Sequence, residues 1–286
     1  MRTAKTVRIT CIDQHISAGK RIYADRYRLC ERITGYEGEP EFLEIPQVID
    51  NCTVTETADN AFYGCRSLKR VILPPTMRKI GENCFYACSS LEEAILPDGL
   101  EKMGKSAFCG CTSLEHIIIP DSLHELPESC FRACTALSEV NFTSGVRKIG
   151  GYAFSGCTGL EKVTFGDELS EIGERAFFMC GRLSEMYIPS SLTKLADESV
   201  GYVPSNDGAA PMQGFVLHGR KNSEVQEYAE KCGMKFKPNN DIIRCSSVFH
   251  PSKKSQKISE LCVLLLFGML FAVINRKMNK KTGMEN

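Results

Sequence analysis

The sequence has no excess of charge of either sign. Its 286 residues include 35 lysines and arginines and 35 aspartates and glutamates, so the formal net charge is zero. Nonspecific binding of nucleic acid needs a basic surface, and we therefore predict that nucleic acid is not a partner. The apolar fraction of 43% and the charged fraction of 24% are ordinary for a folded soluble domain.

Motifs that carry catalysis are also missing. The sequence contains no phosphate-binding glycine loop, no nucleophile elbow and no H-E-x-x-H pair, and its five histidines are scattered. His116 is the only one whose neighbours in the repeat described below are acidic, namely Glu93 and Glu139, and such a row can orient an imidazole or bind a metal weakly. Charge alternation on a solvated surface explains the row more simply. We predict no enzymatic activity, no cofactor, no metal and no small-molecule substrate.

The beginning of the sequence, MRTAKTVRITCIDQ, lacks the run of roughly 7 to 15 apolar residues that a secretory signal contains. The sequence also has 15 cysteines, which without a signal fit a reducing compartment best. We therefore expect the repeats on the cytoplasmic side of a membrane, with the soluble cytoplasm or the cell surface as alternatives.

What the sequence does contain is a repeat of constant length. Six phenylalanines recur at intervals of 23 residues: Phe62, Phe85, Phe108, Phe131, Phe154 and Phe177. A cysteine stands three residues after each one: Cys65, Cys88, Cys111, Cys134, Cys157 and Cys180. A period of roughly 20 to 30 residues over several copies is typical of a solenoid, in which each coil buries its apolar side against its neighbours.

Each copy also predicts one short strand. A leucine recurs at Leu68, Leu91, Leu114, Leu137, Leu160 and Leu183. Apolar residues stand three and five positions after it: Val71 and Leu73, Ala94 and Leu96, Ile117 and Ile119, Val140 and Phe142, Val163 and Phe165, Met186 and Ile188. Because strand side chains alternate, the last two apolar residues of a copy face the same side of the strand. Proline ends the strand in several copies, as at Pro74.

A second apolar pair follows the strand in each copy, for example Met77 and Ile80, and in four copies glycine comes next. These glycines are Gly81, Gly104, Gly150 and Gly173. We expect glycine there because its permissive φ lets the backbone bend toward the phenylalanine. The predicted fold is an α/β solenoid with one short parallel strand per 23-residue coil and with turns and short helix on the other side.

The segments 149–163, IGGYAFSGCTGLEKV, and 172–186, IGERAFFMCGRLSEM, resemble the 23-residue repeat of the BspA-type leucine-rich repeat family of bacterial surface proteins. The resemblance covers roughly residues 35–200, and residues 215–236 are similar to the module that often closes such arrays. It implies a right-handed leucine-rich solenoid that binds proteins or host surfaces. The family offers no catalytic residues to transfer to this chain.

The repeat accounts for most of the cysteines whose chemistry could be in question. A column of cysteines in successive coils would stack about 4.8 Å apart, where a small thiol suits a buried turn. Cys84 and Cys130 take the position that alanine fills in other copies. A zinc site pairs two short-spaced dyads, whereas Cys88, the close neighbour of Cys84, already belongs to the column. We predict structural thiols; disulfides between stacked thiols are the alternative that a thiol titration would test.

The repeat also divides the chain. The predicted parts are an N-terminal segment (1–34), the solenoid (35–200), a strand-helix-strand cap (201–237), a polar tether (238–257), a candidate transmembrane anchor (258–275) and a basic tail (276–286). A degenerate first coil with Phe42, Leu43 and Ile45 forms the entry to the solenoid. In the exit cap, Ser223 can cap a helix that runs from 224 to 232 and ends at Gly233, between strands at 215–217 and 234–236.

The candidate anchor rests on one apolar segment, Leu261 to Ile274, which lysines and arginines flank on both sides. A bilayer core takes about 20 apolar residues, with a lower limit near 17, so the segment is short, although flanking lysines can extend its reach. We predict a single-pass C-terminal anchor, with a buried terminal helix as the alternative. Similar positive charge on both sides leaves the orientation open.

The outward positions of the predicted strands form the candidate binding surface. The first outward residues are Arg70, Glu93, His116, Glu139, Lys162 and Glu185, and the second are Ile72, Ile95, Ile118, Asn141, Thr164 and Tyr187. Three adjacent isoleucines predict an exposed apolar stripe of the kind that marks contact surfaces, and Tyr187 can anchor its far end. Equally, β-branched residues simply favour strands and pack sideways on one another.

These patterns predict a non-catalytic repeat protein that binds a protein partner or a surface through its exposed sheet face. A structural or self-associating scaffold is the first alternative, because a weakly capped solenoid can stack end to end. A thiol-based metal or redox protein is the second.

Overall fold

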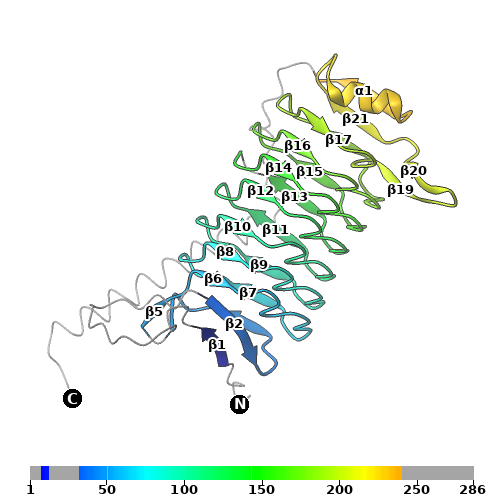
Figure 1. Ribbon diagram of the computed structural model, residues 1–286. Coiled ribbons are helices and arrows are strands. Elements are labelled where there is room, and N and C mark those ends of the chain that lie inside the picture. The colour runs from blue at the N-terminus through cyan, green and yellow to red at the C-terminus, as the bar shows by residue number, and fades with distance from the viewer. Residues whose placement is uncertain (1–7, 13–31, 50, 143, 240–286) are drawn as a thin grey trace, which may run out of the picture. The chain divides into compact units, whose positions relative to one another are not determined.

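The computed structural model describes residues 8–12, 32–49, 51–142 and 144–239. The chain falls into two units, 1–245 and 246–286, and the described residues belong to the first. Within that unit the repeats wind into a solenoid, each copy adding one coil (Figure 1). Strands pair with strands 23 residues later, as Arg70 does with Glu93. The predicted parallel-strand solenoid is confirmed.

The predicted strand of each copy lies in a parallel sheet that we call the long sheet. Its strands are β3 (Phe42–Glu44), β7 (Arg70–Ile72), β9 (Glu93–Ile95), β11 (His116–Ile119), β13 (Glu139–Phe142) and β15 (Lys162–Thr164). The next coil contributes β17 (Glu185–Tyr187), which starts a three-stranded parallel sheet with β21 (Val216–Gly219) and β22 (Lys235–Pro238).

Each coil carries a second, two-residue strand instead of the predicted short helix. This second row consists of β6 (Glu56–Thr57), β8 (Lys79–Ile80), β10 (Lys102–Met103), β12 (Glu125–Leu126), β14 (Lys148–Ile149), β16 (Glu171–Ile172) and β18 (Lys194–Leu195). A helix with its side chains is about 10 Å wide, whereas paired strands lie about 4.8 Å apart. Coils that stack at the strand spacing therefore leave no room for a helix in every repeat.

Irregular elements stand before and after the repeats. At the entry, β1 (Arg8–Ile12) pairs antiparallel with β2 (Arg32–Glu37), which joins β6 in parallel, and β4 (Val48–Ile49) forms a hairpin with β5 (Cys52–Thr53). At the exit, a hairpin of β19 (Tyr202–Ser205) and β20 (Gly208–Pro211) is followed by β21, the helix α1 (Glu224–Lys231) and β22. The strand, helix and strand predicted in this region are present. Ser223 precedes the helix, but its hydroxyl donates to the Arg220 carbonyl and caps nothing.

A stack of phenylalanine rings forms the centre of the core. The six rings of the repeat are at most 1% exposed, and successive centroids lie 5.0 to 5.5 Å apart with planes within 14° of parallel. Each phenylalanine N–H donates to a carbonyl of the next coil over 2.7 to 2.8 Å. The predicted phenylalanine column is confirmed, and such ring contacts add about 0.5–1.5 kcal/mol each to the burial of area.

Two residues in each coil adopt the left-handed conformation, one on either side of the phenylalanine. The residue two positions before the ring position has positive φ at Asn60, Asn83, Ser106, Ser129, Tyr152, Arg175 and Glu198. The residue two positions after it has positive φ at Gly64, Ala87, Gly110, Ala133, Gly156 and Met179. Non-glycine residues in this conformation cost about 1 kcal/mol each, so the packed ring must hold the turn in place.

The four glycines that follow the second apolar pair serve a different purpose from the one that we expected. Gly81, Gly104, Gly150 and Gly173 do not have positive φ. A Cβ at Gly104 would lie 2.3 Å from the Glu82 nitrogen of the preceding coil, and one at Gly150 would lie 2.7 Å from the Glu128 nitrogen. Glycine is needed here because adjacent backbones approach too closely for a side chain.

The predicted anchor, 258–275, lies outside the described residues, as do the basic tail and most of the tether. None of the helices that the structure describes has the length and apolarity that crossing a bilayer requires.

We expect Gly104→Ala to lower the free energy of unfolding by about 1–3 kcal/mol, because the added methyl group overpacks the contact with the preceding coil. Gly64→Ala is the matched control: its φ is +68°, no atom lies within 4 Å of the added Cβ, and two other copies carry alanine there. It should lose only about 1 kcal/mol. Urea unfolding of both variants provides the measurement, and a larger loss for Gly64→Ala contradicts the close-approach explanation.

Candidate functional site

The outer face of the long sheet, together with β17 of the next coil, presents the predicted binding residues in two rows. In each strand the middle residue is buried and its neighbours are more exposed. The first outward positions, from Arg70 to Glu185, form the charged row. Ile72, Ile95 and Ile118 form the isoleucine stripe. At the same position of the later strands, the stripe is continued by Asn141, Thr164 and Tyr187. Pairing in register, as of Ile118 with Asn141, places each row across the strands.

The charged row neutralises part of its own charge. The Arg70 Nε atom lies 2.7 Å from a Glu93 carboxylate oxygen, and the Lys162 Nζ atom lies 3.0 Å from Glu139. These groups are partly exposed, so each pair contributes about 0–1 kcal/mol. Their main effect is to occupy both basic side chains of the row.

His116 does not form the Glu-His-Glu constellation that its row allows. Glu93 and Glu139, the two acidic residues in register with it, pair with Arg70 and Lys162 instead. The His116 Nε2 atom lies 3.9 Å from Glu115, its neighbour in sequence. Among the described residues there is no group of three or more histidine, cysteine or acidic side chains that could hold a metal.

The isoleucine stripe is the apolar part of this face. Ile118 is 66% exposed, and Ile72 and Ile95 are half-buried. The partial burial of Ile72 and Ile95 fits sideways packing of β-branched neighbours. Ile118 has little such cover and leaves a large apolar side chain in contact with solvent.

The far end of the face is shaped by a residue that sequence reasoning missed. The His218 ring, from β21, stacks on Tyr187 with centroids 4.0 Å apart, and its Nε2 atom lies 3.2 Å from Glu185. Burial first, and then the nearby Glu185 carboxylate, raises the pKa of Tyr187. His218 belongs to the exit cap, outside the 23-residue period, so only its alternation within a strand could have indicated it.

Phe42 extends the charged row at the other end. It is 68% exposed and pairs in register with Arg70, whereas Leu43 and Ile45 of the same degenerate coil are buried. Because this coil lacks the repeat pattern, the sequence does not show which of its three apolar residues faces outward.

The turns carry a second group of exposed aromatic side chains that the sequence analysis did not single out. Tyr63, 54% exposed, stacks on Tyr86 with centroids 5.0 Å apart. Farther along, Arg175 lies over the Phe178 ring at 5.3 Å. The Tyr63–Tyr86 contact joins neighbouring coils and the Arg175–Phe178 contact lies within one coil, and both stabilise the turns.

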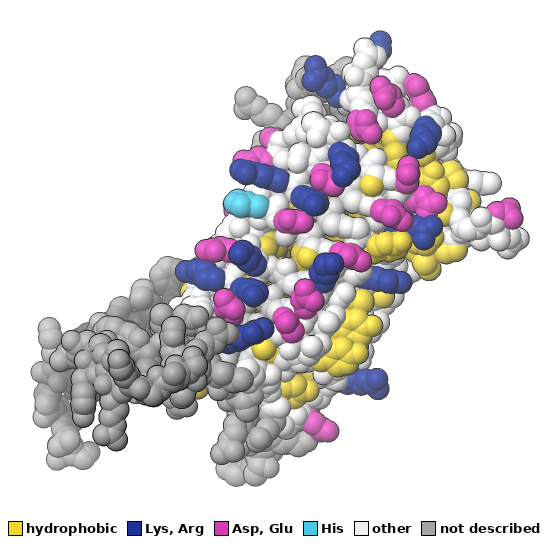
Figure 2. All heavy atoms as spheres, viewed as in Figure 1, with side chains coloured by type: hydrophobic (Ala, Val, Ile, Leu, Met, Phe, Trp, Pro, Cys, Tyr) yellow, Lys and Arg dark blue, Asp and Glu magenta, His cyan; other side chains and the backbone are white. Residues whose placement is uncertain are grey.

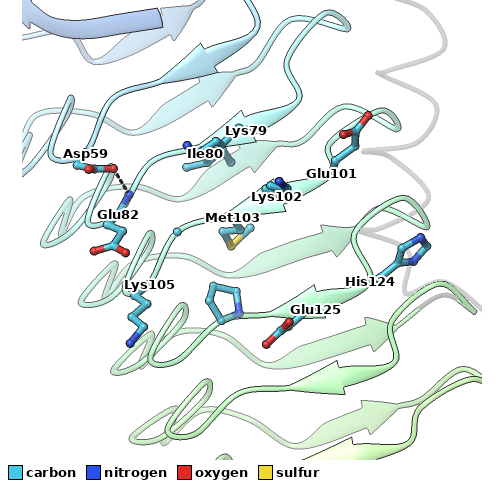
Figure 3. Close-up of a pocket in the computed structure, with 12 residues that line it drawn as sticks. Asp59, Lys79, Ile80, Glu82, Glu101, Lys102, Met103, Lys105, His124 and Glu125 are labelled. Carbon is cyan, nitrogen blue, oxygen red and sulfur yellow. Dashed lines mark hydrogen bonds between the residues drawn. The ribbon is translucent and has the colours of Figure 1, made fainter.

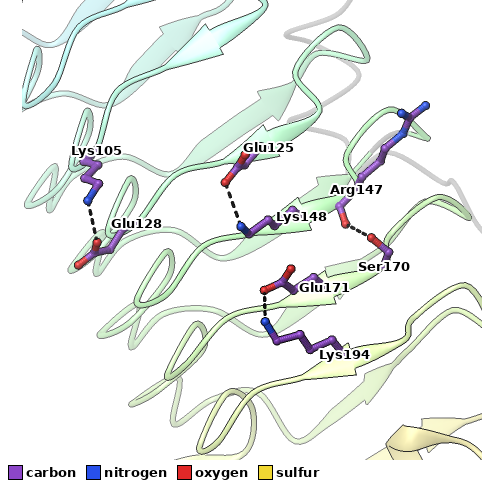
Figure 4. Close-up of polar contacts among 8 residues, drawn as sticks. All are labelled: Lys105, Glu125, Glu128, Arg147, Lys148, Ser170, Glu171 and Lys194. Carbon is purple, nitrogen blue, oxygen red and sulfur yellow. Dashed lines mark hydrogen bonds and ion pairs between the residues drawn. The ribbon is translucent and has the colours of Figure 1, made fainter.

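The second row carries a ladder of ion pairs (Figure 4). Glu125 lies 3.5 Å from Lys148, and Glu171 lies 2.8 Å from Lys194, whose hydrogen bond lowers the pKa of Glu171. Both signs of charge are interspersed on the face that Figure 2 shows. The ladder leaves this surface with little unbalanced charge.

A shallow hollow interrupts the second row between β10 and β12 (Figure 3). Pro127 stands where Gly104, Gly150 and Ala196 donate a backbone N–H to the preceding coil, and proline has no N–H to donate. The two-residue strands therefore form separate sheets on either side of it. Lys102 and Glu125 lie among the mixed charges of its lining.

The cysteine column is buried and hydrogen-bonded, as predicted for structural thiols. From Cys88 onward, each thiol donates to the carbonyl of the phenylalanine in the preceding coil, over 3.2 to 3.3 Å. None of the described cysteines forms a disulfide. Burial raises the pKa of Cys84, Cys88 and Cys157 to about 12, and a neutral thiol is a poor nucleophile and metal ligand.

This burial predicts a loss of stability in alkali. The folded state holds the Cys157 proton to about pH 12, whereas the ordinary thiol pKa is 9.0. The stabilising effect is therefore complete below about pH 9 and is lost as the pH rises from 9 toward 12, by about 1.4 kcal/mol per pH unit for each such thiol. In urea unfolding under reducing conditions, Cys157→Ala should lose less stability between pH 8 and pH 10.5 than the wild type. An equal loss in both proteins contradicts the prediction.

Comparison with known proteins agrees with this geometry. The family model described as BspA type leucine rich repeat region matches residues 43–150 and 125–203 in six copies. The T. pallidum leucine rich repeat protein TpLRR is 29% identical, with a TM-score of 0.57 over 72% of this chain and 89% of that one. A leucine rich cell surface protein from Faecalibacterium prausnitzii is 28% identical, with a TM-score of 0.54 over 63% of this chain and 56% of that one.

A leucine-rich repeat protein from Eubacterium ventriosum, 22% identical with a TM-score of 0.50 over 59% of this chain and 47% of that one, shares the fold. No curated protein matches the sequence. The location that we predicted from the sequence stays a prediction. The family model spans residues 43–203, more than half of the sequence, and the chain therefore belongs to the BspA-type leucine-rich repeat family.

Proposed function

We propose that this protein is a non-catalytic recognition module whose long-sheet face binds a protein partner. The observation that carries the proposal is the isoleucine stripe, where Ile118 is 66% exposed on a regular strand. Its contact residues are the charged row, the isoleucine stripe and the three residues that continue the stripe: Arg70, Glu93, His116, Glu139, Lys162, Glu185, Ile72, Ile95, Ile118, Asn141, Thr164 and Tyr187.

The composition of this face fits an interface. Apolar side chains lie in the isoleucine stripe and charged side chains in the charged row beside it, which resembles the apolar centre and polar rim of protein interfaces. Tyr187 and Arg70 are residue types that often contribute most to binding. The Thr164 hydroxyl donates to Asn141, so this pair is ordered before a partner arrives.

The rigidity of the face also supports binding. Backbone pairing in the long sheet and the phenylalanine stack beneath it hold the rows at a constant spacing. Binding to a preorganised surface loses little conformational entropy.

The first alternative, a self-associating scaffold, draws on the exposed Phe42 at the β3 edge of the long sheet. At the exit end, β22 is the edge strand of the three-stranded sheet and carries Lys235, Lys237 and Pro238, and lysine and proline on an edge strand oppose pairing with another copy. Sedimentation across a range of concentrations separates the two functions, because end-to-end assembly must increase with concentration.

The second alternative, thiol-based metal or redox chemistry, needs accessible thiolates. From Cys88 onward, the column thiols are buried and donate hydrogen bonds, and their raised pKa keeps them protonated at neutral pH. Metal analysis of the purified protein tests this alternative.

We expect the double variant Ile95→Asp/Ile118→Asp to weaken partner binding at least tenfold, because two apolar contacts at an interface commonly contribute about 1–2 kcal/mol each. Thermal unfolding should change little, since Ile118 is exposed. Val48→Asp is the matched control: Val48 is 54% exposed in β4, away from the long sheet.

The measurement is quantitative capture from cell extract by immobilised full-length protein, comparing the wild type with both variants. The proposal requires partners that the wild type and Val48→Asp retain and the double variant loses. Equal capture by all three proteins, or a loss of folding in the double variant alone, would place the isoleucines outside a binding surface.

A further inference from the structure

The sequence around Ile95 and Ile118 is strongly acidic, although the whole chain is neutral. The two stretches that contain Ile95 and Ile118, residues 89–100 and 112–123, contain five carboxylates and no lysine or arginine. These carboxylates are Glu92, Glu93, Asp98, Glu115 and Asp121. The equivalent stretch around Ile72, residues 66–77, carries Arg66, Lys69 and Arg70 and no carboxylate, so the acidic part of this face lies at β9 and β11.

The described structure offers few positive charges to balance them. Arg70 pairs with Glu93, and His116 faces Glu115 at 3.9 Å. Glu92, Asp98 and Asp121 are exposed, and none of them forms an ion pair with another residue that the structure describes. Lys69 lies 3.1 Å from Glu41, and Arg78, whose guanidinium lies beside Gly99, is 4.0 Å from Glu101.

In sequence, these carboxylates stand before and after the isoleucines of β9 and β11. Glu92 and Glu115 immediately precede the charged row, and Asp98 and Asp121 each stand three residues after an isoleucine. Charges of one sign around an apolar contact attract a partner of the opposite sign and repel others. A complementary surface therefore has apolar side chains with lysine or arginine on both sides of them.

The spacing of the stripe favours one conformation for that surface. Adjacent strands lie about 4.8 Å apart, so three isoleucines in neighbouring strands span about 9.6 Å across the sheet. In a helix, residues i and i+3 are about 4.5 Å apart along the axis and residues i and i+7 about 10.5 Å. Same-face residues of an extended strand are about 6.6 Å apart, which does not match the spacing of about 4.8 Å between the isoleucines.

From these observations we propose that the partner presents an amphipathic helix that lies across β7, β9 and β11, and that lysine and arginine flank the apolar stripe of this helix where it crosses β9 and β11. The inference rests on the proposed function and adds the chemical class of the partner. The isoleucine stripe accepts the apolar side chains, and Glu92, Asp98 and Asp121 face the basic ones.

A library of random 18-residue peptides displayed on phage tests the proposal with the full-length protein. Peptides are selected on the wild type and depleted on Ile95→Asp/Ile118→Asp, so that only ligands of the stripe survive. We expect survivors with a net positive charge, apolar residues at i, i+3 or i+4 and i+7, and lysine or arginine beside them.

Charge reversal then tests the role of the carboxylates. We expect Glu92→Lys/Asp98→Lys/Asp121→Lys to weaken a selected peptide by about tenfold, since each exposed charge contact contributes a few-fold effect. The control Glu82→Lys/Asp207→Lys/Glu227→Lys makes the same charge change at three exposed carboxylates away from this face and should stay within about twofold of the wild type. Raising the salt concentration should weaken wild-type binding more than binding by the reversed variant.

The outcomes separate this inference from the proposed function. Survivors without an excess of lysine and arginine, or with unchanged affinity for the charge-reversed protein, overturn the basic-helix inference and leave a binding face. Absence of any survivor contradicts both. Concentration-dependent self-association of the wild type in sedimentation, lost in Ile95→Asp/Ile118→Asp, would identify a second copy of the chain as the occupant and would also overturn the inference.

Discussion

The short distance between successive coils is the constraint on which the other features depend. Backbone hydrogen bonds hold the coils together in the long sheet, in the second row and at the phenylalanine turns. At the strand spacing of about 4.8 Å, a phenylalanine ring can only lie flat on the next ring, and position 104 has no room for a Cβ. The same proximity lets the Cys111 thiol reach the Phe85 carbonyl.

Stacking at this distance turns each outward position of the repeat into a row across the surface. A row has a property that no single coil has, because identical or complementary side chains become neighbours. In the second row the charges alternate and pair, as for Glu171 and Lys194. In the long sheet, three isoleucines become one stripe. Partner specificity can therefore change at outward positions while the buried columns stay the same.

Periodicity explains how much of this structure could be predicted from sequence. Phe131, Cys134 and Val140 recur with the coil, so their equal spacing in sequence means equal surroundings in space, and their burial follows. Features that depend on distances between coils did not follow, and for that reason the role of Gly104 was misjudged. Features outside the period were also missed, among them the outward orientation of Phe42 and the stacking of His218 on Tyr187.

The candidate site was predictable in its positions but not in its electrostatics. Alternation along the strand is enough to place Ile118 and His116 on the outer face. Which charges remain unbalanced depends on the contacts that long side chains make between coils, such as Arg70 with Glu93.

The surfaces of the solenoid differ in how many of their charged groups and exposed rings are paired within the protein. The second row pairs its carboxylates with lysines, and the exposed rings at the turns stack on one another or lie beneath arginine. On the long-sheet face, an exposed isoleucine lies close in sequence to carboxylates without an ion pair among the described residues, Asp121 among them. Apolar area and unbalanced charge are the two properties that a partner can satisfy. Because both occur together on this face, it is the described surface that gains most from being covered.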